Sequence, residues 1–315
     1  MSGIEVLASG MLTTVQDLGR EGFGAMGISA SGAADAGALR LGNRLLGNTE
    51  GAAGLEMTLL GGAFLFRGRS VIAIAGSDFE ATLEGAVIEP WTSVQVQAGE
   101  TLRFGPTPSG ARCYLCVQGG IVVENFLGSA STHLLSGLGG FEGRALRKGD
   151  VLRCGPPHGT FQKRSFSPQT LLRLAPRKTL RATQGPQWDW FSTESRQAFF
   201  TSTYKVAEES NRMGLRLEGT ALTLQNESSG GEMLSEGVAL GAIQIPESGK
   251  PIVLFVEQQT TGGYPKIANV ISADMSSVGQ LRPRDEIRFE LVDMRTARAL
   301  YIEQERLFTS EDLFE

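Results

Sequence analysis

The chain has 315 residues, of which 41% are hydrophobic and 20% charged, which is the composition of a globular protein long enough for two domains. Its net charge is −5 and it has no block of consecutive Lys or Arg residues, which argues against binding to nucleic acid. No apolar run is long enough to span a bilayer and the N-terminus lacks the pattern of a secretion signal, so we expect a cytoplasmic protein without membrane association.

Strands are predicted along most of the chain. The 41 glycines and 12 prolines indicate many turns and favour a mainly β fold over a helical bundle. Short stretches that are rich in β-branched residues and bounded by glycines are typical of strands in sandwiches or barrels. Such stretches lie at 63–68, 70–76, 93–99, 113–120, 221–225 and 251–257.

Only three segments have a clear helical pattern. They span residues 31–48, 193–204 and 292–308. Ser31 is the expected N-cap of the first helix, which ends at a Gly-Asn pair.

The segment 264–271 has both a helical spacing of apolar residues and a high β-branched content. The β-branched residues favour a strand that ends at Ile271. A short helical turn is predicted after it, beginning near Ala273.

A short pattern recurs along the chain: "AGETLRFGP" at 98–106, "KGDVLRCGP" at 148–156 and a weaker "PRDEIRFEL" at 283–291. Each copy reads as a turn followed by a half-buried strand, and their repetition suggests barrels. Residues 155–169 combine Pro, Gly and basic residues without periodicity, so we expect a linker there and a new strand from Thr170. The chain is therefore divided near residue 160.

The three cysteines cannot all pair, and an odd number suits a reducing compartment. Cys113 and Cys116 lie on a predicted strand, where residues three apart face opposite sides, so we expect buried thiols instead of a metal or redox site. His133 and His158 are the only histidines, and structural or surface roles are expected for them.

Several common catalytic motifs are absent from the sequence. It contains no G-x-x-x-x-G-K-[ST], no G-x-G-x-x-G that opens a helix after a strand, and no G-x-S-x-G elbow. A nucleotide would therefore be bound in another way, and a Ser–His–Asp hydrolase is not expected.

Two polar clusters stand out in the first half of the chain. Gln16, Asp17 and Arg20 flank a predicted turn, although a local Asp17–Arg20 salt bridge would explain two of them. Residues 27–43 run from a small-residue loop into a helix, whose free N–H groups and dipole favour a carboxylate or phosphate. The alternative is an ordinary capped helix. The candidate binding residues of this second cluster are Ser31, Asp35 and Asn43.

Two further clusters lie in the second half. Asn211 and Arg212 precede a glycine, and the planar guanidinium suits a carboxylate or phosphate. The run "EQQTTGGYPKIA" at 257–268 follows an apolar strand, and its glycines allow a ligand close to the backbone. A decorated hairpin turn is the alternative for this run. Its candidate residues are Gln259, Thr260, Thr261, Gly262, Gly263, Tyr264 and Lys266.

Together these clusters carry a resemblance to a known family. The stretches "TTVQDLGR", "SGAADAGALRLGNRLLGN", "GLGGFEGRALRKGD", "SNRMGLRLEG", "SEGVALGAIQIP" and "QTTGGYPKIANVISADMSSVGQLRPRDEIRF" occur in this order. Over roughly residues 5–292 the chain resembles the C subunit of bacterial ATP-dependent 5-oxoprolinase, the KipA-like family also called allophanate hydrolase subunit 2. That family is related to the carboxyltransferase domain of urea carboxylase. A departure lies at "GISASGAAD", where many relatives have "GVPVSGAMD".

The resemblance implies a mainly β protein with two cyclophilin-like β-barrel domains and a few short helices. We place these domains at 1–160 and 161–292, with a C-terminal helix and tail at 293–315. It also implies a complex with a KipI-like B subunit and a LamB/YcsF-like A subunit, which opens 5-oxoproline to L-glutamate with ATP and Mg²⁺. No biotin attachment sequence is present, so the carboxyltransferase kinship is taken as ancestry.

Roles for individual residues follow as hypotheses from this activity. Lys266, Arg20 and Arg212 would supply positive charge to a transferring phosphoryl group, and Asp17 or Asp35 would hold Mg²⁺, partly through water. Tyr264, Gln259 and Thr261 would orient the lactam. Two alternatives stay open: a non-catalytic regulatory partner of a KipI-like protein, and a subunit that acts on a urea-derived amide such as allophanate.

Overall fold

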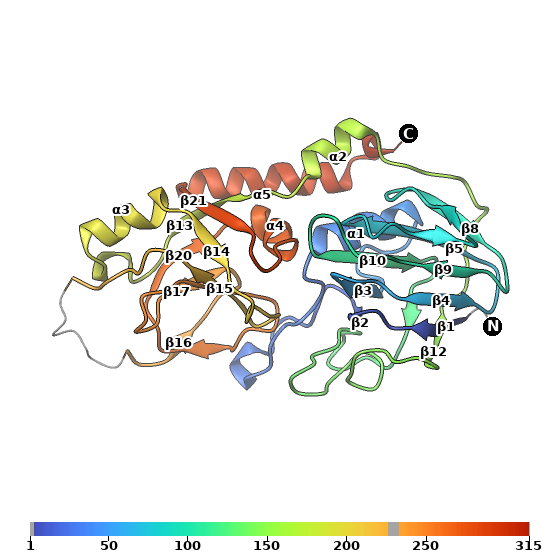
Figure 1. Cartoon of the computed structure of the whole chain (residues 1–315), viewed down its shortest axis with the longest axis horizontal. Helices are drawn as coiled ribbons and strands as arrows, with labels where there is room; N and C mark the ends of the chain where they lie inside the picture. The colour runs from blue at the N-terminus through green and yellow to red at the C-terminus, as the bar shows by residue number, and fades with distance from the viewer. Residues whose placement is uncertain (1–2, 226–232, 315) are drawn as a thin grey trace. The chain divides into compact units, whose positions relative to one another are not determined.

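The computed structural model describes residues 3–225 and 233–314, and the chain divides into two compact units (Figure 1). Unit 1 comprises the chain up to Arg20, Ser31–Ala175 and the residues from Phe308. Unit 2 comprises Glu21–Ala30 and Pro176–Leu307. The expected domain limits at 160 and 292 stay a prediction, and each unit is described by itself below.

Unit 1 is built from two mainly antiparallel sheets and two helices. The seven-stranded sheet has the order β11-β12-β1-β4-β9-β6-β7, and the five-stranded sheet has the order β2-β3-β10-β5-β8. The first sheet consists of β1 (Gly3–Ala8), β4 (Ala63–Phe66), β6 (Thr82–Leu83), β7 (Ala86–Val87), β9 (Thr101–Arg103), β11 (Ile121–Val122) and β12 (Val151–Cys154). The second consists of β2 (Leu12–Gln16), β3 (Gly54–Thr58), β5 (Ser70–Gly76), β8 (Ser93–Val96) and β10 (Arg112–Val117). The helices are α1 (Ala36–Leu45) and α2 (Pro168–Leu174).

The core of unit 1 lies between its two sheets. Side chains of the first sheet, such as Phe64 and Leu152, share one buried cluster with Leu55 and Ile74 of the second. Such face-to-face packing is how two sheets each bury one side from water. Burying this apolar cluster is the main favourable contribution to the stability of the unit.

Helix α1 begins later than its sequence pattern predicted. The expected cap, Ser31, has a left-handed φ of 56° and lies in the preceding loop. Asp35 is the N-cap instead, because its carboxylate accepts a hydrogen bond from the N–H of Ala38 at 2.9 Å. Ser31 was therefore wrong as a cap, and the small-residue loop extends to the acid that can satisfy the first turn.

Two predicted strands are also wrong. Residues from Thr170 form α2 and not a strand, because Ser167 caps the N–H of Thr170 and Pro168 occupies the first helical position. The strand expected at 221–225 is reduced to a single bridge between Leu224 and Phe191. Its apolar residues pair with a loop instead of a neighbouring strand.

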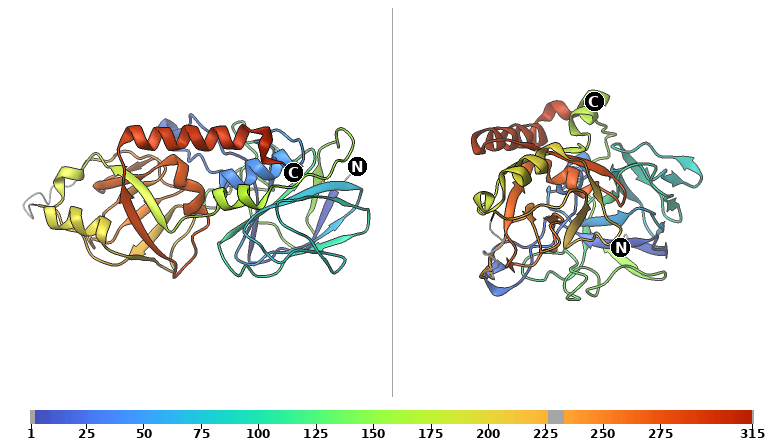
Figure 2. Two further views of the ribbon diagram at one scale, coloured as in Figure 1. Left: turned by 90° about the horizontal axis from the view of Figure 1, so that it is seen from above. Right: turned by 60° about the vertical axis from the view of Figure 1, so that its left-hand side comes forward.

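Unit 2 contains a closed seven-stranded barrel in the order β13-β20-β17-β18-β15-β14-β21 (Figures 1 and 2). Closure comes from the parallel pairing of β13 with β21, in which Leu180 lies opposite Phe289. The barrel strands are β13 (Thr179–Gln184), β14 (Tyr204–Val206), β15 (Gly214–Glu218), β17 (Ala242–Gln244), β18 (Ile252–Leu254), β20 (Lys266–Val270) and β21 (Glu286–Leu291). A closed barrel leaves no unpaired edge, which removes the hazard of edge-to-edge association.

Smaller elements decorate this barrel. A two-stranded ribbon pairs β16 (Glu236–Gly237) with β19 (Thr261–Gly262). The helices are α3 (Thr193–Thr201), α4 (Met275–Gly279) and α5 (Met294–Thr309), the last of which passes into unit 1 at Phe308. The short 3-10 helices are η1 (Gly24–Met26), η2 (Trp188–Trp190), η4 (Ser272–Asp274) and η5 (Glu311–Leu313), and η5 belongs to unit 1.

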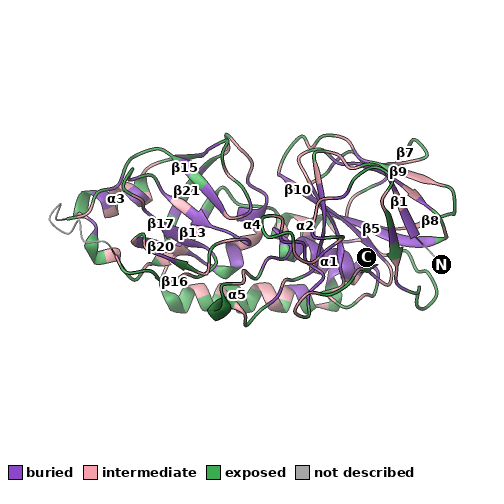
Figure 3. Ribbon diagram, turned by 90° about the horizontal axis from the view of Figure 1, so that it is seen from below, coloured by how far each residue is buried: buried purple, intermediate pink, exposed green. Residues whose placement is uncertain are grey.

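Aromatic packing joins α3 to the barrel. The ring of Phe199 stacks on that of Phe289 with a centroid separation of 4.6 Å, and Tyr204 packs against both. Figure 3 shows that the barrel strands are largely buried whereas most of α5 is exposed. The helix α5 therefore contributes little to the core of unit 2.

The expected mainly β fold with few helices is confirmed. So are the strand that ends near Ile271 and the helical turn after it, which the structure places at Ser272–Asp274 and continues in α4. None of the helices in the described part of the chain is long and apolar enough to cross a membrane.

The cap of α1 can be tested directly. Replacing Asp35 with Ala should lower the free energy of unfolding by about 1 kcal/mol, because the N–H of Ala38 loses its acceptor. Asp35→Asn should retain most of the stability, since Asn caps equally well. Urea denaturation of both variants measures the difference, and equal losses in both would contradict the capping role.

Candidate functional site

The end of β2 carries a buried carboxylate that is bound from several sides. Asp17 Oδ1 accepts hydrogen bonds from the hydroxyls of Ser129 at 2.6 Å and Ser131 at 2.5 Å, and from the N–H of Gly19 at 2.8 Å. Its Oδ2 accepts from the N–H of Ala130 at 2.7 Å. Asp17 therefore fastens the loop at 129–131 to the end of β2, with two hydroxyls and two amides in place of water.

Arg20 is bound to the same loop. Its guanidinium donates to the carbonyls of Ser131 and Phe126, and it packs over the Phe126 ring at 5.5 Å from the centroid. A side chain on Gly139 would lie 2.2 Å from the Ser131 carbonyl and 2.8 Å from the Arg20 Nη2. Only a glycine fits there, so the segment around Gly139 closes over the Arg20 side chain.

Gln16 and Ser31 meet at one carbonyl. The Gln16 Nε2 donates to the Thr132 carbonyl at 3.1 Å, and the Ser31 hydroxyl donates to the same oxygen at 2.8 Å. The structure thus brings four of the predicted residues, Gln16, Asp17, Arg20 and Ser31, to one loop at 126–132, of which residues 129–132 are buried. That loop contributes mostly backbone and hydroxyl groups.

Asp35 and Asn43 stand apart from this loop, at the two ends of α1. Beside Asp35, the Glu56 carboxylate accepts from the Tyr114 hydroxyl at 2.7 Å and the Ala34 N–H at 2.8 Å. Burial raises the pKa of Tyr114 well above its ordinary value, so this hydroxyl stays protonated and can donate. Asn43 donates to the carbonyls at 50 and 52, which anchors the turn after α1.

In unit 2, Arg212 forms a buried ion pair. Its Nε lies 2.5 Å from Glu257 Oε1, and both side chains are almost completely buried. The backbone joins the same two residues, because the Glu257 N–H donates to the Arg212 carbonyl at 2.8 Å. The neighbouring Asn211 uses its Oδ1 to cap the N–H of Met213 at 2.8 Å. Arg212 is thus held at the start of the 257–268 run.

Lys266 begins β20, and its side chain is paired with an acid. Its Nζ lies 2.6 Å from Glu236 Oε1, and the Gln187 Nε2 donates to the same oxygen at 2.9 Å. The Lys266 side chain is buried whereas that of Glu236 is half-exposed. The Lys266 Nζ hydrogen bond lowers the pKa of Glu236, with a smaller effect from Gln187.

The other residues of the run surround this pair. The ribbon pairs Gly262 with Glu236 and Thr261 with Gly237, so the run lies beside the acid that binds Lys266. Gln259 Nε2 donates to Gln244 Oε1 at 3.2 Å, and the N–H of Val238 donates to the Thr260 carbonyl at 3.2 Å. The remaining two predicted residues are Gly263 and Tyr264, and Tyr264 is about half-exposed. The run therefore forms one polar group with Glu236, Gln244 and Gln187.

Most of the predicted residues thus fall into one group in each unit, whereas Asp35 and Asn43 lie apart, at the two ends of α1.

The two acids proposed for Mg²⁺ do not fit that role. Asp17 already accepts four hydrogen bonds, and Asp35 caps α1. Magnesium binds through carboxylates that can face it without competing donors. Across residues 3–225 and 233–314, no group of three or more His, Cys, Asp or Glu residues is arranged to hold a metal ion.

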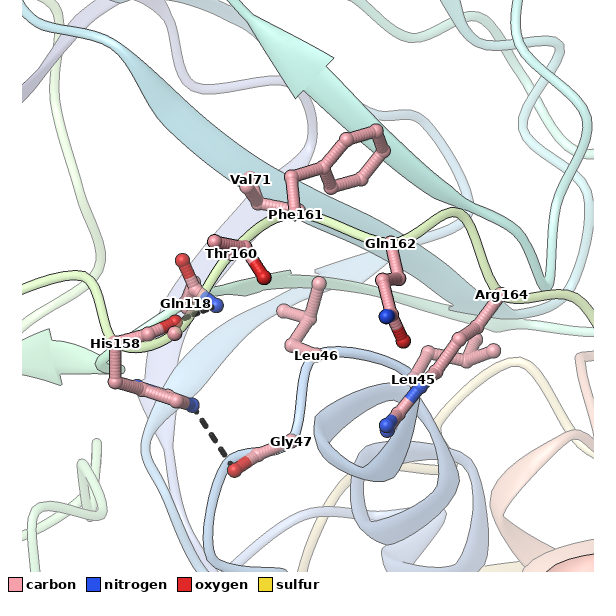
Figure 4. A pocket seen from close by; sticks show the side chains of 11 residues that line it. Leu45, Leu46, Gly47, Val71, Gln118, His158, Thr160, Phe161, Gln162 and Arg164 are labelled. Carbon is pink, nitrogen blue, oxygen red and sulfur yellow. Dashed lines mark hydrogen bonds between the residues drawn. The ribbon is translucent and has the colours of Figure 1, made fainter.

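A cavity of about 150 Å³ lies in unit 1 at the C-terminal end of α1 (Figure 4). None of the predicted site residues lines it. Two of its polar side chains contact the backbone: His158 Nε2 lies 3.0 Å from the Gly47 carbonyl, and Gln118 Nε2 donates to the His158 carbonyl at 2.8 Å. These contacts hold the residues after α1 against the segment around His158. We therefore interpret the cavity as a feature of packing and not as a binding site.

The cysteines have no reactive environment. Cys113 faces the core between the sheets, and the Cys116 thiol approaches the Leu39 carbonyl of α1 at 3.8 Å, so the two point to opposite faces of β10 as predicted. Burial raises the pKa of Cys116 to about 12, which keeps the thiol protonated and unreactive. His133 accepts from the Ser136 N–H through Nδ1.

Comparison with known proteins identifies the protein family of this chain. Residues 26–291 match the carboxyltransferase domain, subdomain A and B, and the chain belongs to this family. It is 38% identical to the C subunit of 5-oxoprolinase from Escherichia coli, over 97% of this chain and 96% of that protein. It is 37% identical to the C subunit of 5-oxoprolinase from Haemophilus influenzae, over 98% and 99%. The resemblance expected from the sequence motifs is confirmed.

A solved structure shares the fold but belongs to a much longer chain. The urea amidolyase of K. lactis superposes with a TM-score of 0.92 at 32% identity, over 99% of this chain but 21% of that one. The urea amidolyase of Saccharomyces cerevisiae is 34% identical over 99% of this chain and 18% of its own length.

Sequence reasoning missed the partners of the predicted residues. In unit 1 these are Ser129, Ser131 and Thr132, and in unit 2 they are Gln187, Glu236, Gln244 and Glu257. Glu236 stands in the quoted "SEGVALGAIQIP" stretch, which offered a signal. Gln187 and Ser129 stand in ordinary loop sequence, and only the tertiary pairing reveals them.

Removing one partner of the Arg212–Glu257 pair should lower the stability strongly, and removing both should restore most of it. Arg212→Met should lower the free energy of unfolding by about 3–5 kcal/mol, because Glu257 remains buried without its cation. The double variant Arg212→Met/Glu257→Met should regain most of that loss, since no charge is then left buried. Urea denaturation of the three variants tests this, and a double variant as unstable as Arg212→Met alone would contradict it.

The Lys266–Glu236 pair predicts a shifted titration. A carboxyl whose folded pKa lies below its ordinary value stabilises the fold above that ordinary value, and this contribution is lost as the pH falls through the lowered pKa. Glu236 should therefore titrate below 4.5 in the wild-type chain and move up toward 4.5 in Lys266→Met, as followed by carbon NMR of its carboxyl. Lys250→Met, at an exposed position of the same unit, serves as the control. An unchanged Glu236 titration in Lys266→Met would refute the pairing.

Proposed function

We propose that this chain is the C subunit of a cytoplasmic ATP-dependent 5-oxoprolinase, which opens 5-oxoproline to L-glutamate together with a KipI-like B subunit and a LamB/YcsF-like A subunit. One observation carries the proposal. The two relatives that bear the name of the 5-oxoprolinase C subunit are matched over 96% and 99% of their own length. The urea amidolyases share the domain only as a small part of a longer chain.

The chemistry asks for positive charge and positioning. The lactam amide resists hydrolysis, and phosphorylation of its carbonyl oxygen by ATP gives a better electrophile. In this step the lactam oxygen forms a bond to the γ-phosphorus as the bond from that phosphorus to ADP breaks. Water then adds to the activated carbon and the ring C–N bond breaks, with the nitrogen taking up a proton. A second water hydrolyses the resulting acyl phosphate to L-glutamate and phosphate. The protein contributes mainly orientation and electrostatic stabilisation.

We assign Lys266 the role of supplying this positive charge. It is a buried ammonium beside the half-exposed carboxylate of Glu236, and an anionic group of the substrate or of ATP can take the place of that carboxylate. Arg212 is held more firmly by the buried Glu257, so its role is to fix the 257–268 run. Tyr264 and Thr261 are exposed and can reach a ligand.

In unit 1, we assign Asp17 and Arg20 the role of holding a loop in place. The four hydrogen bonds to Asp17 leave it as the anchor of the loop that Arg20 also binds. We assign Asp17 to holding this loop and not to a metal. ATP and its Mg²⁺ are then expected to be bound in the assembled complex, with the metal held by groups other than Asp17 and Asp35.

A urea-derived amide is the second candidate substrate. The structural similarity to urea amidolyase at a TM-score of 0.92 favours it, because one scaffold can carry related sites for different amides. Lactam and ureide both present a carbonyl oxygen, so the same groups could bind either. Substrate competition in one assay separates them.

The proposal is tested by reconstitution. The chain with its two partner subunits should release glutamate and ADP from 5-oxoproline and ATP, and should not do so with urea or allophanate. Lys266→Ala should lower kcat/KM by roughly 100-fold or more, as loss of a charge that stabilises the transition state does. Complex formation, followed by size-exclusion chromatography, should be unchanged.

Lys250→Ala is the matched control, an exposed lysine of the same unit. Turnover of allophanate in place of 5-oxoproline would favour the second candidate. A complex without turnover of either compound would favour a regulatory role for this chain.

A further inference from the structure

One buried glutamine of unit 2 has no part in the proposed reaction. Gln187 follows β13 and directly precedes η2, and it is only 7% exposed. It stands at the N-cap position of η2, but its side chain makes no capping hydrogen bond there. Buried amides are nearly always hydrogen-bonded, so the partners of this side chain show what it holds in place.

Both polar atoms of the Gln187 amide are bonded to the Lys266–Glu236 pair. Its Oε1 accepts from the backbone N–H of Lys266 at 3.1 Å, and its Nε2 donates to Glu236 Oε1 at 2.9 Å. The Lys266 ammonium lies 2.6 Å from that same carboxylate oxygen. Because the Lys266 N–H needs an acceptor, it fixes the position of Oε1, and the Nε2 of the amide must then face Glu236.

The backbone holds this glutamine against the first residue of β20. The Gln187 N–H donates to the Lys266 carbonyl at 3.3 Å, and the Gly185 N–H donates to the Ile267 carbonyl at 2.9 Å. A Cβ on Gly185 would lie 2.3 Å from the Lys266 carbonyl oxygen, so only a glycine lets the loop approach β20 this closely. Gln187 is therefore anchored on the barrel independently of its side chain.

Glu236 is placed much less firmly by its own strand. The strands β16 and β19 have two residues each and form a sheet of their own, and both residues of β16 are exposed. An isolated pair of strands is marginally stable in water. The position of the Glu236 carboxylate therefore depends on its two bonds to the barrel, one from Lys266 and one from Gln187.

We propose that Gln187 is a positioning residue for Lys266. It fixes the start of β20 through the Lys266 N–H, and it keeps the Glu236 carboxylate on the Lys266 ammonium until an anionic group of a ligand replaces that carboxylate. The bond to the Lys266 N–H remains when Glu236 leaves, so the ammonium keeps its place. Gln187 itself touches no ligand, and its role requires no space beside its side chain. The inference rests on the proposed function in taking Lys266 as the source of positive charge.

The titration of Glu236 tests this contact in the chain alone. Gln187→Met keeps a similar volume but has no N–H donor and only a weak acceptor. Carbon NMR of the carboxyl should show the Glu236 pKa rising toward 4.5 in this variant, by less than in Lys266→Met, because Lys266 has the larger effect on that pKa. Gln187→Glu is the second variant. Its carboxylate still accepts from the Lys266 N–H but repels Glu236, so the Glu236 pKa should rise further than in Gln187→Met. Gln197→Met, at an exposed position of α3, should leave the titration unchanged.

Turnover by the reconstituted complex tests whether Gln187 acts through Lys266. Gln187→Met should lower kcat/KM for 5-oxoproline by about 3- to 10-fold, as loss of neutral hydrogen bonds predicts. The same substitution in a Lys266→Ala background should lower it no further, because a positioning residue acts only through the group that it positions. A purely structural role would give the same fold-loss in both backgrounds. Gln197→Met should retain wild-type turnover.

The outcomes separate this inference from the proposed function. A Glu236 titration that is unmoved in both Gln187 variants, or equal fold-losses of turnover in the two backgrounds, overturns the positioning role. So does wild-type turnover by Gln187→Met in a complex that loses turnover on Lys266→Ala, and the proposed function then stands. A titration that moves as expected, in a chain whose wild-type complex does not open 5-oxoproline, supports the hold of Gln187 on the Lys266–Glu236 pair and refutes the proposed function.

Discussion

Each buried charge of the two polar groups must be matched by a donor or a counter-charge from a distant part of the chain, because an unmatched ion in the interior is strongly destabilising. Asp17 meets this requirement with hydroxyls and amides from a loop more than a hundred residues away. Arg212 meets it with Glu257, and Lys266 with Glu236. These pairings fix where the loops and the ribbon lie, so the polar residues organise the fold around them.

The three pairings differ in how easily a ligand can enter them. Asp17 and Arg212 have buried partners and several hydrogen bonds, so exchange of either partner would expose an ion to the apolar interior. Glu236 is half-exposed and stands on a two-residue strand, so water can solvate it when it leaves Lys266. Of the charges considered, Lys266 is therefore the one whose counter-ion a small anion can replace with the least destabilisation.

The periodicity of apolar residues predicted much of the fold. The features that it missed depend on local capping residues and on contacts between residues far apart in the sequence. The strands at 63–66, 70–76 and 112–117 and the turn after Ile271 follow from alternation and β-branching. The strand expected from Thr170 failed because a Ser-Pro pair outweighs the apolar run, and the cap at Ser31 failed because the loop continues to Asp35. The site residues were chosen by residue type, which identifies Lys266 but not Glu236 or Gln244, since those depend on which strands become neighbours.

The shared scaffold explains why related proteins can act on different amides. A closed barrel with a polar group at the ends of β17 and β20 places an amide donor and an ammonium on neighbouring strands, whatever lies in the loops around them. Under the proposed function, a lactam and a ureide would both present a carbonyl oxygen to this polar group, so the group would not distinguish them. The distinction must come from groups that touch the rest of the ligand, such as the exposed Tyr264 and Thr261 on the run beside it. Substrate choice in this family is thus expected to change through the ribbon and its flanking residues, while the barrel strands stay the same.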